Sequence, residues 1–109
     1  MPQITMRGMT PEAASSLAGQ VKNIVVNVTG TAANYVTLEY IPSLQLDTNG
    51  ICASFAKLDI LWLTGRPQAM HDAVAKALTE LFRQNGFDRL QITFTNMPPA
   101  YFYDNGEHY

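Results

Sequence analysis

The chain repeats one pattern of prolines and glycines, and this duplication is the strongest constraint on its fold. A shift of 56 residues superimposes three pairs: Pro11 on Pro67, Gly30 on Gly86, and Pro42 on Pro98. Proline is favoured at the first position of a helix, and glycine readily takes the left-handed conformation that ends one. Each interval from proline to glycine is therefore predicted to hold one helix.

Both intervals show apolar residues at helical spacing. In the first they are Ala14, Leu17, Ala18, Val21, Ile24, Val25 and Val28. In the second they are Met70, Ala73, Val74, Ala77, Leu78, Leu81 and Phe82. Residues three and four apart share one face of a helix, so each interval predicts an amphipathic helix that faces a core. Thr10 is a suitable N-cap for the first helix.

Four further segments are typical of β-strands because they alternate and are rich in β-branched or aromatic residues. They are Gln3 to Arg7, Tyr35 to Ile41, roughly Ala53 to Leu63, and Leu90 to Thr95. The chain thus runs β-α-β twice in a single domain, with halves at about residues 1–46 and 51–109. Such connections form right-handed parallel crossovers. We predict an α+β fold with a four-stranded mixed sheet and two helices on one face.

Between the halves, Asp47-Thr48-Asn49-Gly50 reads as a turn, and residues 44–46 and 51–52 could form a hairpin around it. The predicted sheet keeps one uncovered face. On the third strand Ile60 and Trp62 alternate with Asp59 and Leu61, so neither face is purely polar. Because apolar area on an open face is usually buried in a symmetric oligomer or against a ligand, we expect self-association.

Composition excludes several classes of protein. The 109 residues are 47% apolar, as in an ordinary globular domain. A net charge of −2 argues against binding the phosphate backbone of nucleic acid. The sequence contains no apolar run of about 20 residues that would span a bilayer. The single cysteine, Cys52, is typical of a reduced cytoplasm, and we expect it to be buried and inert.

Pro2 could take part in acid–base chemistry if it stood at the amino terminus. Within a chain a proline nitrogen is an amide, but removal of Met1 would make it a free secondary amine. A free α-amino group titrates near pH ~8, and burial beside cations lowers its pKa. Such an amine can act as a general base, whereas with Met1 retained it cannot. The alternative is that Pro2 merely tolerates the first position of a strand.

Two sequence motifs resemble those of a known protein family. They are the run Leu61-Trp62-Leu63-Thr64-Gly65-Arg66 and the Met-, aromatic- and Gly-Glu-containing ending from Thr95 to Glu107. With the initial proline and the duplication, they make the whole chain similar to the tautomerase superfamily, which contains 4-oxalocrotonate tautomerase (4-OT) and macrophage migration inhibitory factor. Similarity is greatest to an uncharacterised bacterial branch. The resemblance implies a homotrimer that acts on a small carboxylate substrate, and no cofactor is indicated.

The resemblance also implies roles for individual residues. Pro2 would move a proton between carbons of a keto acid or its enol, Arg66 would bind the substrate carboxylate, and Phe102 would form an apolar wall. Tyr101 and Tyr103 alternate around Phe102, which predicts a short strand with one face buried, and either face could enter a neighbouring subunit's site. A guanidinium suits a carboxylate geometrically, although Arg66 could equally be a solvated loop cation.

The chain departs from the family pattern at one position. Short tautomerases place a second arginine on the strand after the first helix, where this chain has Thr37-Leu38-Glu39-Tyr40. Glu39 could transfer protons or hold an arginine, but an isolated strand carboxylate is more often a surface or paired residue. Arg7, at the end of the first strand, could face the same pocket or solvent.

The remaining polar residues suggest no other site. His71 is one residue off the apolar stripe of its helix and is expected to be solvated, and Glu107 and His108 lie at a terminus that is mobile by default. No residues have the spacing of a metal site or a phosphate loop. The alternative functions are an inactive tautomerase-fold protein that binds a small ligand or forms a trimeric scaffold, and a ferredoxin-like regulatory domain.

Overall fold

The computed structural model describes all residues, 1–109, and contains the predicted β-α-β duplication. The first half holds β1 (Gln3–Arg7), α1 (Pro11–Thr29) and β2 (Thr37–Tyr40). The second half holds β5 (Ala56–Leu63), α2 (Gln68–Gln84) and β6 (Leu90–Met97). Both halves thus fold into the same unit, and the predicted fold class is confirmed.

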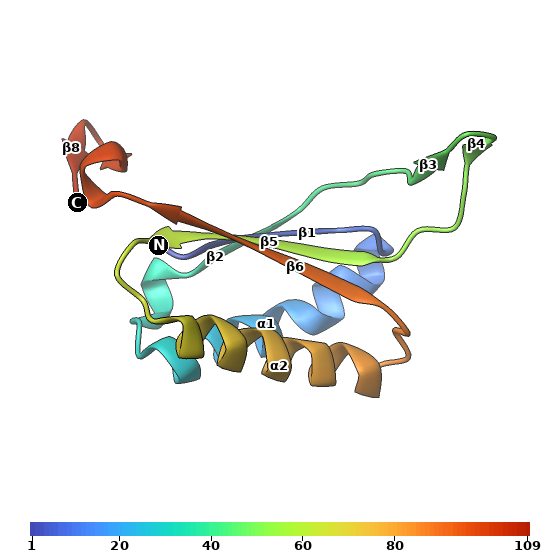
Figure 1. Cartoon of the computed structure of the whole chain (residues 1–109), viewed down its shortest axis with the longest axis horizontal. Coiled ribbons are helices and arrows are strands. Elements are labelled where there is room, and N and C mark those ends of the chain that lie inside the picture. The colour runs from blue at the N-terminus through green and yellow to red at the C-terminus, as the bar shows by residue number, and fades with distance from the viewer.

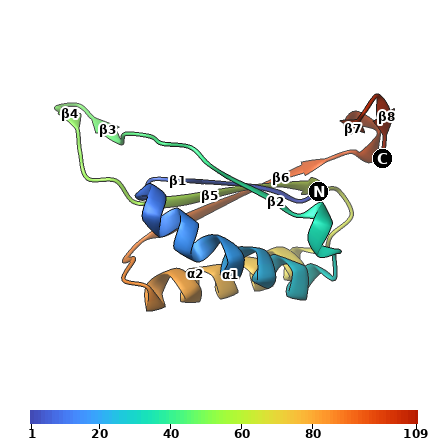
Figure 2. The ribbon, with the colours of Figure 1, turned by 180° about the vertical axis from the view of Figure 1, so that it is seen from behind.

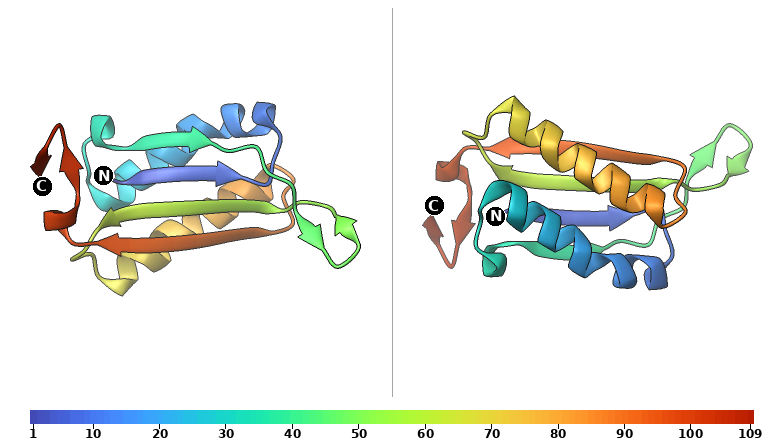
Figure 3. Two further views of the ribbon diagram at one scale, coloured as in Figure 1. Left: turned by 90° about the horizontal axis from the view of Figure 1, so that it is seen from above. Right: turned by 90° about the horizontal axis from the view of Figure 1, so that it is seen from below.

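The four long strands form one mixed sheet in the order β2-β1-β5-β6. Each half contributes a parallel pair, and β1 joins the halves by pairing antiparallel with β5. Both helices lie on one face of the sheet and the other face is open (Figure 1). The view onto the open face shows the four strands side by side with the helices behind them (Figure 3, left).

Two small hairpins extend beyond the sheet at opposite ends (Figure 2). The first comprises β3 (Leu46–Asp47) and β4 (Gly50–Ile51), which confirms a hairpin between the halves. The second comprises β7 (Tyr103–Asp104) and β8 (Glu107–His108) at the C-terminus, where the default expectation was mobility. Cys52 follows the first hairpin and is only partly covered, so the expectation of a buried thiol was wrong.

Four strand boundaries differ from prediction, the smallest difference being that β2 ends at Tyr40 and not at Ile41. β2 begins at Thr37 because Ala33–Tyr35 forms a 3-10 turn, in which the Val36 N–H donates to the Ala33 carbonyl. β5 begins only at Ala56, after the first hairpin. β6 continues to Met97, since its pairing with β5 extends to the last residue of that strand.

The core lies between the sheet and the helices. Its largest fully buried side chains include Trp62 and Phe82, and Ile60 also faces it. Ile60 and Trp62 therefore contribute nothing apolar to the open face.

Thr10 caps α1 as predicted, with its Oγ1 accepting a hydrogen bond from the Ala13 N–H at 3.1 Å.

The open face is less apolar than the alternation on β5 suggested. Its apolar residues are Leu61 and Leu63 on β5 and Met97 on β6, and all three are partly buried. Polar side chains occupy most other outward positions. No helix of the structure is both long enough and apolar enough to cross a membrane.

Gly8 links β1 to α1 where the chain passes close to β5. A Cβ at this position would collide with the backbone carbonyl of Phe55, whereas a Cβ at Gly30 would meet nothing within 4 Å. Both glycines have positive φ, +82° and +72°, so alanine is strained at either site. We expect Gly30→Ala to cost about 1–2 kcal/mol of unfolding free energy and Gly8→Ala distinctly more. Urea denaturation of both variants tests this, and equal losses would contradict it.

Candidate functional site

The amino terminus lies inside the fold, at the start of β1. Met1 is 7% exposed and Pro2 is fully buried. The Met1 ammonium donates to the Tyr35 carbonyl at 2.8 Å, and the Thr37 N–H donates to the Pro2 carbonyl at 3.1 Å. The turn before β2 and the first residue of that strand therefore hold the first two residues in place. With Met1 present, the Pro2 nitrogen is an amide and cannot accept a proton.

Charge and burial change the acidity of the terminal amine. Burial, and then the positive charge of Arg66, lower the pKa of the Met1 amine, while the Asp104 carboxylate acts in the opposite direction. Desolvation and a neighbouring cation both disfavour the ammonium form. The start of the chain thus lies where an amine is more readily neutral than it is in water.

Arg66 lies in the loop between β5 and α2 and is held in a partly buried position. Its Nη1 and Nη2 donate to the Leu63 carbonyl and to Thr31 Oγ1, each at 3.2 Å. The guanidinium lies over the Trp62 ring, 4.7 Å from its centroid, and burial lowers its pKa. Neither ion pair of the chain involves Arg66, so its charge has no carboxylate partner. These contacts differ from those expected for a solvated loop cation.

A hydrogen-bonded cluster supports the ring beneath Arg66. Trp62 Nε1 donates to Asn96 Oδ1 at 2.7 Å, and His71 Nε2 lies 3.2 Å from the same oxygen. His71 Nδ1 lies 3.0 Å from the Pro67 carbonyl, and its ring packs edge-on to Trp62 and Phe94. His71 is buried, so the expectation that it is solvated was wrong. It lies three residues before Val74 on the buried face of α2, which also carries Leu78 and Phe82, and this spacing turns it toward the sheet.

A hollow of about 500 Å³ opens beside the amino terminus, between the turn before β2 and the C-terminal hairpin. Its four apolar residues are all aromatic: Tyr35, Phe102, Tyr103 and Tyr109. The other lining residues are Gln3, Asn34, Thr37 and Asp104. Phe102 and Tyr109 meet edge to face with centroids 4.8 Å apart.

The expected strand across Tyr101 and Tyr103 is only partly present. Pro99–Tyr101 forms a 3-10 turn, and the strand begins at Tyr103. Tyr101 is 75% exposed and does not line the hollow. The proline pair before it explains the difference, because fixed proline φ angles favour such a turn over a strand.

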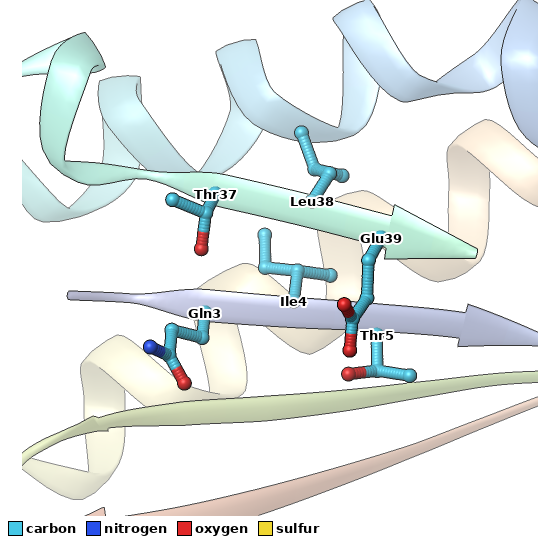
Figure 4. Close-up of a pocket in the computed structure, with 6 residues that line it drawn as sticks. All are labelled: Gln3, Ile4, Thr5, Thr37, Leu38 and Glu39. Carbon is cyan, nitrogen blue, oxygen red and sulfur yellow. The ribbon is translucent and has the colours of Figure 1, made fainter. Parts of the chain in front are cut away.

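Glu39 lies on the open face and not in the aromatic hollow. It lines a smaller depression of about 180 Å³ with Gln3, Thr5 and Thr37, and its side chain reaches from β2 toward Thr5 on β1 (Figure 4). Glu39 makes no ion pair, in agreement with the surface interpretation.

Arg7 does not join the site near the amino terminus. It lies at the other end of β1, where its Nε bonds to Asp59 Oδ2 at 3.1 Å. The structure also contains no group of three or more His, Cys, Asp or Glu residues that could hold a metal.

The terminal amine bonds to Tyr35, which lines the aromatic hollow, and Arg66 acts on that amine electrostatically, but neither Pro2 nor Arg66 lines the hollow itself. Of the residues predicted from sequence, Pro2, Arg66, Phe102 and Tyr103 lie near this end of the sheet, whereas Glu39 lies on its open face. Sequence reasoning missed three partners: Tyr35, Asn96 and Asp104. Tyr35 reads simply as a strand residue, and Asn96 and Asp104 belong to the family-like ending without any assigned role, so no local signal marked them.

Residues 1–108 match the sequence profile of a family described as a domain of unknown function (DUF1904). No curated protein matches the sequence. Among solved structures, a DUF1904 domain from Sebaldella termitidis is 20% identical and superimposes with a TM-score of 0.91, covering 100% of each chain.

Two further structures place the fold in a wider group. A macrophage migration inhibitory factor-like protein from Entamoeba histolytica is 18% identical, with a TM-score of 0.78 over 99% of this chain and 98% of the other. A fused 4-OT described as a symmetric trimer is 20% identical, with a TM-score of 0.76 over 98% and 94%. The sequence resemblance to the tautomerase superfamily is thereby confirmed at the level of fold.

Proposed function

This chain belongs to the DUF1904 family and has the tautomerase fold, and from that premise we propose that it is a keto–enol tautomerase. Removal of Met1 would leave Pro2 as a secondary amine at the buried start of β1. That amine would take a proton from one carbon of a small keto acid or its enol and return it to another. Arg66 would hold the substrate carboxylate.

One observation carries the proposal: the chain terminus and the unpaired Arg66 guanidinium interact electrostatically at the end of the sheet. Burial, and then the charge of Arg66, lower the pKa of the terminal amine. Anchored by Thr31 and the Leu63 carbonyl, Arg66 keeps further N–H groups for a ligand. A neutral amine beside an anion-binding cation is the arrangement that proton abstraction next to a carboxylate requires.

Conversion of phenylpyruvate between its enol and keto forms tests the activity directly. We expect the chain that begins at Pro2 to accelerate this conversion in proportion to enzyme concentration. An unchanged rate with phenylpyruvate and with a 2-hydroxydienoate would contradict the proposal.

A second candidate function is ligand binding without catalysis. It is favoured by the burial of Met1 and by its hydrogen bond to Tyr35, which would fit a chain that keeps its first residue. In that state the aromatic hollow and Arg66 could still bind a carboxylate, and the protein would act as an oligomeric scaffold.

We further propose that the protein works in the cytoplasm, since its single cysteine forms no disulfide.

We also propose a homotrimer. The fused 4-OT is described as a trimer, and this chain has partly buried Leu61 and Leu63 on its open face, with exposed Leu44, Leu46 and Ile51 around the first hairpin. Burial of such groups between subunits stabilises an assembly. Light scattering should give three times the chain mass of 12.1 kDa. A stable monomer at micromolar concentration would contradict the assembly.

A further inference from the structure

Arg66 lies over the indole of Trp62, and that indole is itself fixed by a hydrogen bond. The guanidinium is 4.7 Å from the centroid of the ring. Trp62 is fully buried, and its Nε1 donates to Asn96 Oδ1 at 2.7 Å. An indole N–H can only donate, so this contact decides which end of the Asn96 amide faces the ring. Arg66 and Asn96 are therefore connected through one side chain.

Asn96 interrupts an apolar row on β6. Side chains alternate between the faces of a strand, so Ile92, Phe94 and Asn96 share the face that is turned toward the helices. The first two pack against the core. Asn96 is the register partner of Trp62 in the parallel pair of β5 and β6, which brings its amide to the indole N–H. The donor that it meets there explains a polar residue at the end of this row.

His71 meets the same oxygen from the helix side. Its Nε2 lies 3.2 Å from Asn96 Oδ1, and its ring is edge-on to Trp62 with centroids 4.7 Å apart. Because Oδ1 accepts from Trp62, it forms a hydrogen bond with His71 only when Nε2 carries a proton. The amide oxygen thus has one donor on β5 and one on α2, and the two together hold Asn96 in place.

The contacts of Arg66 divide its support between the edge and the face of the guanidinium. Nη1 and Nη2 donate to the Leu63 carbonyl and to Thr31 Oγ1, and the Trp62 ring lies beneath the group. A guanidinium stacks on an aromatic face and binds a carboxylate with its N–H fork. If the indole tilted, Arg66 would keep its two hydrogen bonds but lose the surface that sets the orientation of the fork.

We propose that Asn96 is a positioning residue for Arg66: its Oδ1 fixes the indole of Trp62, and the indole orients the guanidinium toward a carboxylate ligand. This inference rests on the proposed function only in assigning Arg66 to the substrate carboxylate. It adds a residue of β6 that acts through Trp62 and not by contact with the reacting atoms.

Binding of the unreactive carboxylate 3-phenylpropanoate tests the inference without catalysis. Calorimetry on the full chain should show weaker binding by Asn96→Ala, by about two- to fivefold, the usual contribution of a cation–π contact at a partly exposed site. Asn96 is exposed, so its replacement leaves no cavity in the core. Trp62→Phe keeps an aromatic face under Arg66 but removes the donor, and it should also weaken binding. The two losses should not add in the double variant, because both substitutions break the same hydrogen bond.

Fluorescence reports on the indole itself, because Trp62 is the only tryptophan of the chain. Asn96→Ala should shift the emission to longer wavelength as the buried ring becomes more mobile and more hydrated. Asn27→Ala is the matched control, since it removes the same amide from an exposed position on α1 outside these contacts. It should change neither the emission nor the dissociation constant.

Several results would overturn the inference. One is wild-type affinity for 3-phenylpropanoate in Asn96→Ala, and another is a pair of losses that add in the double variant. An emission spectrum that Asn96→Ala leaves unchanged would show that the indole does not depend on this amide. Failure of the wild-type chain to bind the ligand would overturn the inference too, because Arg66 would then not be an anion site.

Kinetics separates this inference from the proposed function. A chain whose ligand binding depends on Asn96 but which isomerises no phenylpyruvate supports the inference and contradicts the catalytic role of Pro2. A chain that isomerises phenylpyruvate with the same KM in Asn96→Ala as in the wild type supports the catalytic proposal and overturns the positioning role. If both proposals hold, Asn96→Ala raises KM and leaves kcat nearly unchanged, because Arg66 binds the carboxylate in the ground state and in the transition state alike.

Discussion

A chain that begins at Pro2 is expected to isomerise phenylpyruvate about 10²- to 10⁴-fold faster than the same chain with Met1 retained. The range is the usual contribution of a positioned general base. Only the processed chain has such a base, because Met1 converts the Pro2 nitrogen into an amide. Met1 also occupies the space beside Pro2 and donates to the Tyr35 carbonyl, so it would further hinder a substrate.

The two forms can be prepared from one sequence. Coproduction with a methionine aminopeptidase supplies the processed chain, inhibition of that enzyme supplies the other, and intact-mass measurement verifies each. Because Met1 is buried in the fold, we expect processing to be efficient only before folding is complete. Comparable activity of the two forms would exclude Pro2 as the base and favour ligand binding.

Pro2→Ala provides the matched variant of the processed chain. It keeps an α-amine at the same position but replaces a rigid secondary amine with a flexible primary one. We expect a clear loss of kcat with unchanged circular dichroism and assembly mass. A variant as active as its parent would show that the proline ring does not contribute to the chemistry.

The fold was predictable from the sequence because its signals are local and repeated. Proline and glycine mark the helix ends, and apolar spacing identifies the faces that pack against the sheet. The errors arose where tertiary contacts or local turns decide the structure. Tyr35 belongs to a 3-10 turn although it reads as a strand residue, and His71 is buried because Asn96 and the Pro67 carbonyl satisfy its nitrogens.

The site was predictable only in part, for a physical reason. Pro2 and Arg66 are recognisable because a terminal proline and a Gly-Arg before a helix are unusual local patterns. Asp104 and Tyr35 gain their significance from proximity to the amino terminus, and they are 102 and 33 residues from Pro2 in the sequence. Only the sheet order, which places both parallel pairs together, brings those segments to one end.

Arg66→Ala is expected to raise KM for phenylpyruvate about 30-fold. A charge-assisted pair between the guanidinium and a carboxylate contributes on the order of 2 kcal/mol, and tenfold corresponds to about 1.4 kcal/mol. The effect should fall mainly on KM, because this interaction is made in the ground state as well as in the transition state. Steady-state kinetics on the processed chain measures it.

The same substitution should also change the pH profile. Burial, and then the charge of Arg66, lower the pKa of the terminal amine in the chain that carries Met1, and we expect the same cation to act on the amine of a chain that begins at Pro2. Removal of this cation raises the pKa of the base, so a larger fraction is protonated at neutral pH. The acidic limb of kcat/KM should therefore move to higher pH.

Two variants separate the role of Arg66 from general effects of charge. Arg83→Ala removes an exposed cation that pairs only with Glu80 on α2, and it should alter neither KM nor the pH profile. Arg66→Lys retains the positive charge but loses the two-pronged geometry, so it should restore the pH profile more fully than KM. Nothing else near the terminus offers a carboxylate a positive partner, so KM must rise in Arg66→Ala if Arg66 binds the substrate carboxylate. An unchanged KM would therefore show that Arg66 does not belong to the site.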